Sequence, residues 1–399
     1  MPVIDLLDEL SPVGRNPRTG GYDRLAWTGV DAECRLWFEQ CAEALGLDIE
    51  IDRNGNMWAW WGASFPGSAL VVGSHLDSVP SGGAFDGPLG VASAFAAIGV
   101  LQRDGFTPRR PLAVVAFADE EGARFGVACA GSRLMTGALH PDRARSLMDN
   151  DGISLAEAMT GAGRDAAALG RDQERLDRIG EFIELHVEQG HLPSSHGTEG
   201  LSVPIGVADR IWPHGRWRAD FIGQQNHAGT TPMGSRRDAM VRLASVVLAV
   251  RSAAIAQGAL ATVGKILVEP GAVNAVAGSA TAWIDARASD EAVVRRVLEA
   301  VRRETGTELT EESWTPETAF DASLASKLAA ELGNVPILPS GAGHDAGVLS
   351  LAGIPTAMIL VRNPTGISHA PEERADEADA DAGVSALADV IRSRTTLAA

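Results

Sequence analysis

The 399-residue sequence predicts an α/β fold, in which a mainly parallel sheet is joined by a smaller inserted α+β domain. Two observations support this prediction. Short apolar runs rich in valine and isoleucine alternate with helical patterns through most of the chain, as in proteins built on parallel sheets. A middle region departs from that alternation, because its strand-like runs and two long helical patterns are typical of a small α+β unit.

The alternating part of the sequence contains four short apolar runs that are expected to be buried strands. They span residues 69–73, 112–118, 182–187 and 356–361. The spacing of alanine, leucine and valine predicts helices over residues 90–103, 323–332 and 381–392. Asn54-Gly55-Asn56 predicts a hairpin turn, and Trp58 and Trp60, two residues apart on one face, are interpreted as packing residues.

The middle region is expected to form a domain of its own, within the normal size of domains. Its predicted strands cover residues 217–222, 262–268 and 281–288, and its predicted helices cover residues 237–257 and 291–303. Pro213 and Pro316 lie among polar residues near its ends and are interpreted as hinges. The predicted domains are residues 1–210 with 321–399, which carry the parallel sheet, and the insertion 211–320.

The composition argues against several classes of protein. Acidic side chains number 52 against 34 basic ones, and the formal net charge of −18 repels phosphate backbones and anionic lipids. Neither a nucleic acid nor a membrane is therefore expected as a partner. The three cysteines show no paired spacing, the N-terminal residues are too acidic for a signal peptide, and no run approaches the ~20 apolar residues of a membrane span. A cytoplasmic location is expected.

Several common catalytic motifs are absent from the sequence. It contains no GxxxxGK[ST] loop, no GxGxxG after a strand, no GxSxG elbow and no HExxH helix. The usual sequence support for ATP use, nicotinamide binding or serine hydrolysis is therefore missing.

Polar residues instead gather after the predicted strands, which is where α/β sheets place their sites. They lie in the segments GSHLDSVPSGGAFDGPLG, FADEEGARFG, ELHVEQG and VRNPTGISHAPEE. In chain order they are His75, Asp77, Asp86, Asp119, Glu120, Glu121, His186, Glu188 and His369. Imidazole and carboxylate side chains from four strand ends could converge on divalent metal ions.

Taken alone, each of these residues has an ordinary structural interpretation. His75 and Asp77 could form a buried structural pair, Asp86 could occupy a glycine-rich turn, and His186 could belong to the core. Such coincidences at four strand ends are much rarer together than singly. The residues as a group therefore predict a metal site.

The adjacent Glu120 and Glu121 are the most informative pair, because two buried neighbouring carboxylates repel each other unless a cation or a donor compensates. Successive side chains at a strand end point in different directions, so one carboxylate can bind metal while the other faces the reacting water. A divalent metal lowers the pKa of a water, and a carboxylate can pass its proton to a leaving nitrogen. This pattern indicates a hydrolase that forms no covalent intermediate.

These segments, in this order, resemble the metal-dependent amidohydrolases that comprise N-carbamoyl-L-amino acid hydrolases, allantoate amidohydrolases and β-ureidopropionases, relatives of the co-catalytic zinc aminopeptidases and aminoacylases. The resemblance covers nearly the whole chain. NHAGTTPMGSRRDA at residues 226–239 and SGAGHDA at residues 340–346 are especially specific. It implies that the parallel-sheet domain is catalytic, that the insertion is a lid and dimerisation domain, and that the protein is a homodimer.

The resemblance also implies two divalent metal ions per subunit, with zinc expected and manganese, cobalt or nickel as alternatives. The implied ligands are His75, Asp86, Glu121, His186 and His369. Asp86 would bridge the two ions, His75 and His186 would serve one of them, and Glu121 and His369 would serve the other.

Three further residues are implied to act in catalysis. Glu120 would be the general base, and Asp77 would orient His75. His227 of NHAGTTPM would stabilise the developing oxyanion, often from the partner subunit. Outside this motif His227 would be interpreted as a surface histidine that caps a loop.

The implied substrate-binding residues are Gln189, Asn274, Arg287 and His344. Asn274 and Arg287 match positions that hold a substrate carboxylate, which a guanidinium group binds with two parallel hydrogen bonds. The expected substrate is an N-carbamoyl-L-amino acid or allantoate, a small ureido compound with a carboxylate. Cleavage of its ureido C–N bond would release ammonia, carbon dioxide and the amino compound.

Two other functions remain open at this point. The same metal site could serve an aminoacylase or dipeptidase that cleaves an amide, or a binding or scaffold protein that has kept its metal. The sequence also departs from the family pattern at residues 361–366, after Gly190, and in IWPHGRW, which carries His214 and Arg216. None of these departures touches an implied metal ligand, but they leave the substrate open.

Overall fold

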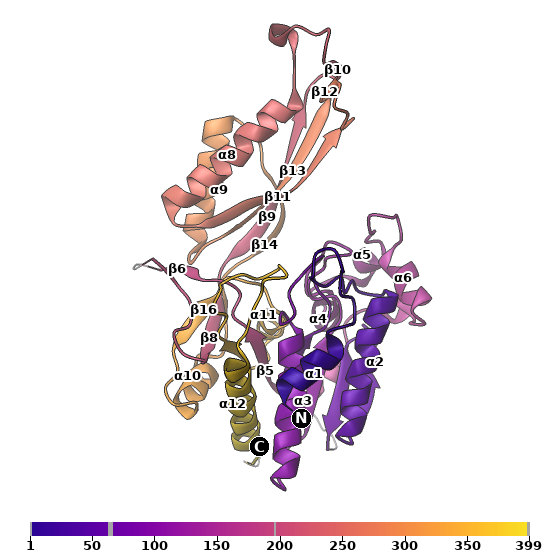
Figure 1. The fold of residues 1–399 in the computed structure, drawn as a ribbon, viewed down its shortest axis with the longest axis vertical. Coiled ribbons are helices and arrows are strands. Elements are labelled where there is room, and N and C mark those ends of the chain that lie inside the picture. Colours follow the sequence, from indigo (N-terminus) through magenta and orange to yellow (C-terminus); the bar gives the residue numbers. More distant parts are fainter. Residues whose placement is uncertain (1, 63–66, 195–196, 397–399) are drawn as a thin grey trace. The chain divides into compact units, whose positions relative to one another are not determined.

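The computed structural model describes residues 2–62, 67–194 and 197–396, and the chain divides into two compact units (Figure 1). The first unit comprises Met1–Arg210 and Ala319–Ala399, and the second comprises Ile211–Thr318. The first carries a large mixed sheet, and the second carries a smaller antiparallel one.

The large sheet belongs to the mainly parallel type that the sequence predicts. Its strands are β1 (Asp48–Ile51), β2 (Met57–Trp61), β3 (Ala69–His75), β4 (Leu112–Phe117), β5 (Ile179–Val187), β8 (Ile205–Ile211), β15 (Thr318–Ala319), β16 (Ile337–Ser340) and β17 (Thr356–Val361). They lie in the order β1-β2-β4-β3-β5-β17-β8-β15, with β16 beside β8. The central strands β4, β3, β5 and β17 are parallel, whereas β1, β2 and β8 pair antiparallel. In a separate two-stranded sheet, β6 (Leu192–Ser194) pairs antiparallel with β7 (Gly197–Glu199).

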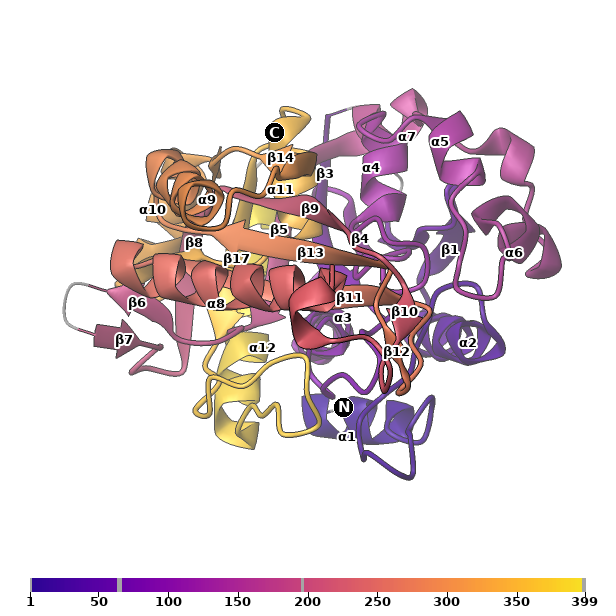
Figure 2. The same ribbon diagram turned by 90° about the horizontal axis from the view of Figure 1, so that it is seen from above.

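Helices pack on both faces of this sheet (Figure 2). One face packs on α1 (Val3–Leu10), α2 (Gly29–Ala44), α3 (Pro88–Arg103), α10 (Ala322–Glu331) and α12 (Glu377–Thr396). The remaining helices of this unit are α4 (Ala130–Thr136), α5 (Pro141–Arg145), α6 (Leu155–Gly161), the 3-10 helix η1 (Ala166–Ala168), α7 (Gln173–Arg178) and α11 (Asp345–Leu351). The residues of β5 alternate accordingly: Ile183 and Leu185 enter the first core, whereas Glu184 accepts a hydrogen bond from the Ala346 N–H of α11.

The predicted strands and helices of this unit are confirmed, with ends shifted by a few residues. The predicted hairpin is also confirmed, since Ile51 of β1 pairs with Met57 of β2 across the turn. Trp58 and Trp60 are buried, and their rings stack with centroids 5.9 Å apart, so they pack as expected. The polar strand ends described below are therefore fixed to a sheet whose strands β3, β4 and β17 are buried along their whole length.

The second unit is the predicted α+β arrangement. Its antiparallel sheet consists of β11 (Leu260–Glu269), β13 (Ser279–Arg287), β9 (His214–Ile222) and β14 (Thr310–Thr315), in that order. One face packs on α8 (Ala239–Gln257) and α9 (Glu291–Thr305). A short antiparallel ladder pairs β10 (Asn226–His227) with β12 (Ala275–Val276). The 3-10 helix η2 (Met233–Ser235) follows β10 in the chain. The sequence did not predict β14, because this edge strand is mostly polar and exposed.

Helix α8 corrects one expectation from the sequence. By length and composition it is apolar enough to cross a membrane, although the sequence was expected to contain no such run. Its Leu243 and Val250 are buried in the core of the second unit. Val241, Leu248 and Ile255 recur every seven residues and are exposed. We interpret α8 as a core helix that carries a second, exposed apolar face.

Candidate metal centre and active site

The carboxyl ends of the parallel strands β4, β3, β5 and β17 meet at one edge of the large sheet. His75 is the last residue of β3, His186 lies near the end of β5, and the segments with Glu121 and His369 follow β4 and β17. The five implied ligands form two groups that share one residue: His75–Asp86–His186 and Asp86–Glu121–His369. Within each group the potential ligand atoms lie within 4.8 Å of one another.

Asp86 presents one carboxylate oxygen to each group. Its Oδ1 lies 3.2 Å from His186 Nε2 and 3.5 Å from His75 Nε2, and its Oδ2 lies 3.3 Å from His369 Nε2. The next residue, Gly87, has a φ of 86°, and a Cβ there would meet the His75 ring at 2.5 Å. Only glycine therefore lets this turn approach the imidazole so closely. Burial raises the pKa of Asp86, but the three imidazoles outweigh burial and hold it well below its usual value.

Two of the imidazoles are oriented by main-chain carbonyl groups. His75 Nδ1 lies 3.1 Å from the Asp77 oxygen, and His186 Nδ1 lies 2.8 Å from the Val187 oxygen. A proton on each Nδ1 would leave the Nε2 lone pair available as a metal ligand. Both Nε2 atoms and Glu121 Oε1 are buried and make no hydrogen bond with the described residues. These atoms are the nitrogen and oxygen donors that zinc or manganese accepts, so the two groups fit a pair of divalent ions.

The two adjacent glutamates face different groups, as strand-end geometry predicts. Glu120 Oε2 lies 3.7 Å from His75 Nε2, whereas Glu121 Oε2 lies 3.6 Å from His369 Nε2. The Asp77 carboxylate holds both glutamates, because its oxygens accept the N–H groups of Glu120 at 3.1 Å and Glu121 at 3.0 Å. Asp77 thus contacts His75 mainly through its main-chain oxygen and orients the glutamate segment with its side chain.

Burial and close neighbouring charges together determine the acid–base properties of this centre. It raises the pKa of Glu120 well above the usual value, and burial together with Asp86 raises the pKa of Glu121 to about 7. Burial alone would lower the pKa of His369, but Asp86 and Glu121 raise it to about 9. For the same reason Glu120, Asp77 and Asp86 raise the pKa of His75 well above its usual value. Without a cation, therefore, the centre retains protons that bound metal would replace.

The structure brings Gln189 and His344 to the same centre. Gln189 Nε2 donates to Asp86 Oδ2 at 2.6 Å and lies 3.4 Å from His369 Nε2. The His344 ring lies with its centroid 4.6 Å from that of His186, and its Nε2 lies 3.0 Å from Ser340 Oγ. Both residues adjoin implied metal ligands; a role in substrate binding stays a prediction.

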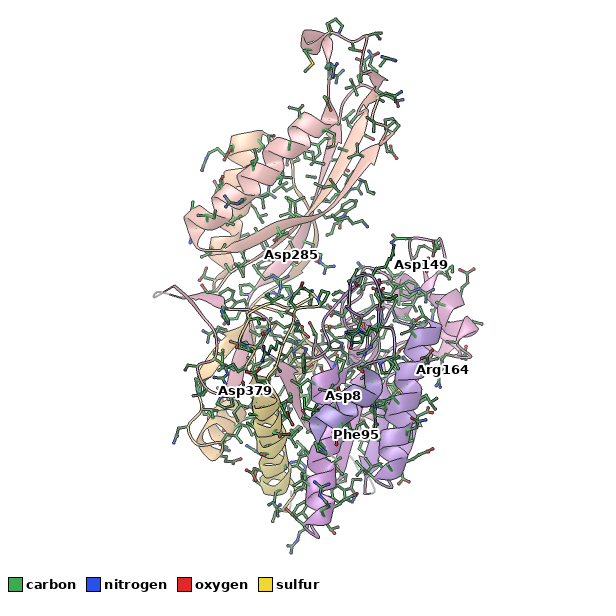
Figure 3. The ribbon with its side chains drawn as sticks, in the orientation of Figure 1. Asp8, Phe95, Asp149, Arg164, Asp285 and Asp379 are labelled. Carbon is green, nitrogen blue, oxygen red and sulfur yellow. The ribbon has the colours of Figure 1, made fainter. Side chains whose placement is uncertain are left out.

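The other implied residues lie in the second unit, at the two ends of β13. His227 pairs with Ala275 in the short ladder, and the Asn274 carbonyl accepts the Ala228 N–H at 2.9 Å, so these exposed residues are neighbours. Arg287 is the last residue of β13, and its Nε and Nη2 donate to Asp285 Oδ1 at 2.9 and 2.6 Å. In Figure 3 the label Asp285 marks the end of β13 that carries Arg287, away from β10 and β12.

Comparison with known proteins assigns the chain to a family. Residues 71–393 match peptidase family M20/M25/M40. The chain belongs to this family. The matched residues include both candidate metal-binding groups and most of the two units.

Within the M20 family, the chain is similar to two curated relatives and to one solved structure. It is 35% identical to an N-carbamoyl-L-amino acid amidohydrolase of Geobacillus stearothermophilus, over 96% of this chain and 95% of that protein. It is 34% identical to an allantoate amidohydrolase of Escherichia coli K12, over 97% and 96%. An amidase of the hydantoinase/carbamoylase family from Burkholderia vietnamiensis has a TM-score of 0.87 at 30% identity, over 98% and 96%. The predicted resemblance, the fold class and the hydrolase class are confirmed.

Sequence reasoning missed three buried residues of this M20 centre. Glu184 accepts hydrogen bonds from Ser74 Oγ at 2.8 Å and the Ala346 N–H at 3.0 Å, which ties β5 to β3 and α11. Its position two residues before His186, on the same face of the strand, was the signal that could have identified it. Cys129, whose thiol lies 3.3 Å from Glu120 Oε1, and Glu373, which contacts the Asp86 segment, carried no comparable signal.

Proposed function

We propose that this M20-family protein is a dinuclear metallohydrolase that cleaves the ureido C–N bond of an N-carbamoyl-L-amino acid or allantoate. The observation that carries the proposal is the Asp86 carboxylate, whose two oxygens face two separate ligand groups. The relatives named for N-carbamoyl-L-amino acids and for allantoate support the substrate class, and their nearly equal identities favour neither compound. The products would be ammonia, carbon dioxide and the amino compound.

The ligand groups give each residue a distinct part in this proposal. His75 and His186 would hold one ion, Glu121 and His369 would hold the other, and Asp86 would contact both. When bound, the two ions would polarise the ureido carbonyl and lower the pKa of the attacking water. Zinc is the ion we expect, with manganese, cobalt and nickel as alternatives that accept the same donors.

Glu120 is the residue that would move the proton. Its Oε1 accepts the Cys129 thiol at 3.3 Å, which leaves Oε2 directed toward His75 Nε2 at 3.7 Å. From there the carboxylate would take a proton from the attacking water and return it to the leaving nitrogen. Burial, which favours the protonated carboxyl, makes Glu120 a stronger proton acceptor than an exposed glutamate.

We further propose that substrate binding requires a homodimer. β13 spans eight residue steps from Ser279 to Arg287, or about 26 Å at ~3.3 Å per residue, and His227 and Asn274 lie beyond its Ser279 end. One small substrate therefore cannot contact His227 and Arg287 of the same chain. A site that uses both residues must combine two chains, as expected from the resemblance for His227.

The surface of the second unit supports a dimer. Val241, Leu248 and Ile255 form an exposed apolar row on α8, and Ile266 and Leu267 are exposed on the edge strand β11. An edge strand beside an apolar helix face can pair with the same surface of a second chain around a twofold axis. The expected oxyanion role of His227 would then be served from the neighbouring chain.

Ammonia release tests the proposed reaction against its alternatives. We would reconstitute metal-free protein with zinc, manganese, cobalt or nickel and supply N-carbamoyl-L-methionine, allantoate or N-acetyl-L-methionine. The proposal expects one ammonia for each ureido bond cleaved, and none without metal. Turnover of the N-acetyl compound alone would support an aminoacylase, and metal binding without any turnover would support a binding protein. Cytoplasmic location stays a prediction.

A further inference from the structure

A buried carboxylate joins two segments of the metal centre that are far apart in the sequence. Glu373 Oε1 accepts the N–H groups of Phe85 and Asp86, each at 2.9 Å, although Asp86 precedes it by 287 residues. Glu373 Oε2 lies 2.9 Å from Ser368 Oγ, which in turn lies 3.1 Å from Asp86 Oδ2. Ser368 immediately precedes His369, so Glu373 contacts the main chain of one ligand and the neighbour of another.

The local sequence makes room for this carboxylate. Glu373 is only 5% exposed, whereas the adjacent Glu372 is exposed. A Cβ on Gly83 would lie 2.2 Å from Glu373 Oε1 and 2.3 Å from its carboxyl carbon. The φ of Gly83 lies outside the left-handed region, so its backbone does not itself require glycine. Glycine at this position therefore provides space for the carboxylate.

The geometry determines which ligands depend on Glu373. Two charge-assisted hydrogen bonds to a single oxygen fix the backbone at Asp86, and hence the direction of its carboxylate. The Ser368 hydroxyl fixes the start of the His369 turn, where His369 has a φ of 58°. Asp86 and His369 are two of the three ligands in the group with Glu121. In the group with His75 and His186, only Asp86 depends on this contact.

We propose that Glu373 is a positioning residue that sets Asp86 against His369 before the second ion binds. The inference rests on the ligand assignment in the proposed function. Residues that orient metal ligands typically change metal affinity about 10-fold to 100-fold when they are removed. Loss of Glu373 should therefore lower mainly the affinity for the second ion, which is the one held by Glu121 and His369.

Calorimetric titration of the metal-free protein with zinc and with cobalt tests this inference. His369→Ala first identifies which of the two binding events belongs to the second ion. Glu373→Ala should then weaken that event about 10-fold to 100-fold, and it should weaken the other event less, because two of the three ligands of that group are unaffected. Glu373→Gln keeps an oxygen that can accept both N–H groups, so it should restore most of the affinity. Glu372→Ala removes the same charge from the adjacent exposed position and should change neither event.

Gly83→Ala provides an independent test that leaves every polar group in place. The new methyl group would displace the Glu373 carboxylate, so Gly83→Ala should weaken binding of the same ion as Glu373→Ala. This test remains available if the Glu373→Ala protein does not fold. Unchanged second-ion affinity in both variants, equal loss of both ions, or a Gln variant no better than Ala would overturn the inference. Two ions bound without ureido hydrolysis would contradict only the proposed substrate, whereas a single ion in the unaltered protein would contradict both proposals.

Discussion

The residues that the sequence assigns to chemistry are mostly buried in the first unit, where the half-exposed His369 is the exception, and are exposed or partly exposed in the second. In the first unit His75 and His186 are each 1% exposed, and their ring nitrogens face neighbouring carbonyl and carboxylate oxygens. In the second unit His227 and Asn274 are exposed, and Arg287 is paired with Asp285 on its own strand. The first set forms a centre within one chain, whereas the second set is divided between two ends of a strand.

This difference shows which parts of the proposed reaction one chain can supply. Buried imidazoles and carboxylates lose their hydration, so they must be compensated by one another or by cations, and this requirement fixes their positions. Exposed side chains in the second unit are hydrated and need no such compensation. The proton-transfer and metal-binding groups should therefore be intrinsic to each chain, while substrate contacts depend on a second surface.

The largest effect is expected from the first unit. Glu120→Gln keeps the size and shape of the side chain but cannot accept a proton, so kcat should fall at least about 100-fold while metal content persists. His369→Ala should instead lower the metal content. Ammonia release measured beside metal analysis separates these two results. Near-normal turnover by the Gln variant would show that Glu120 is not the base.

A smaller effect is expected from the second unit. If Arg287 holds the substrate carboxylate, Arg287→Lys should lower kcat/KM for N-carbamoyl acids about 10-fold or more, because lysine cannot donate two parallel hydrogen bonds. Carboxamide analogues should be affected much less. Arg218→Lys is the matched control, since Arg218 lies on β9, the strand beside β13, and pairs with Asp220 of its own strand. Equal losses on acids and carboxamides would make Arg287 a structural residue.

The position of the metal centre could be predicted because polar residues gather at the ends of apolar runs whose burial the sequence reveals, whereas the choice of the five ligands came from the family resemblance. Parallel strands bring their carboxyl ends to one edge, so His75, Glu121, His186 and His369 had to be near neighbours once the strands were identified. The same rule gave no information on Glu373. It lies beside Glu372 in HAPEE, and only tertiary packing decides which of these two glutamates turns inward.

The second unit shows the other limit of prediction from the sequence. Strand β14 escaped notice because a polar edge strand lacks the apolar alternation that identifies a half-buried strand. The motifs around His227 and Arg287 indicated function, but no local pattern encodes the distance between them. That distance follows from the length of β13 and from the ladder that joins β10 to β12.

Mixed dimers test whether the separated ends of the second unit meet across two chains. Inactive Glu120→Gln subunits are mixed with inactive His227→Ala subunits and allowed to exchange. Random pairing makes half of the dimers mixed, each with one intact and one doubly defective site, so about one quarter of the original activity should return. A mixture of His227→Ala with Arg287→Ala should recover similarly.

The control for this experiment uses two changes within the first unit. Glu120→Gln mixed with His369→Ala should recover no activity, because both residues serve the centre of a single chain. Subunit exchange is verified by mass or by tags. If exchange occurs and the His227 mixture stays inactive, His227 does not act across the dimer.

The smallest expected effect is a count of protons, and it isolates the electrostatics of the Asp86–Glu121–His369 group in the first unit. Asp86 and Glu121 raise the pKa of His369 to about 9 against burial, so at pH 8 most metal-free protein has this imidazole protonated. Metal must displace that proton, so affinity should rise with pH up to about 9 and binding at pH 8 should release it. The raised folded-state pKa also stabilises the metal-free fold below pH ~6.5, and this contribution is lost as the pH rises through about 9.

Zinc titrations in two buffers of different ionisation enthalpy should show that His369→Asn releases about one proton fewer than the unaltered protein. His227→Asn, in the second unit, should release the same number as the unaltered protein; equal release by all three proteins would refute the raised pKa of His369.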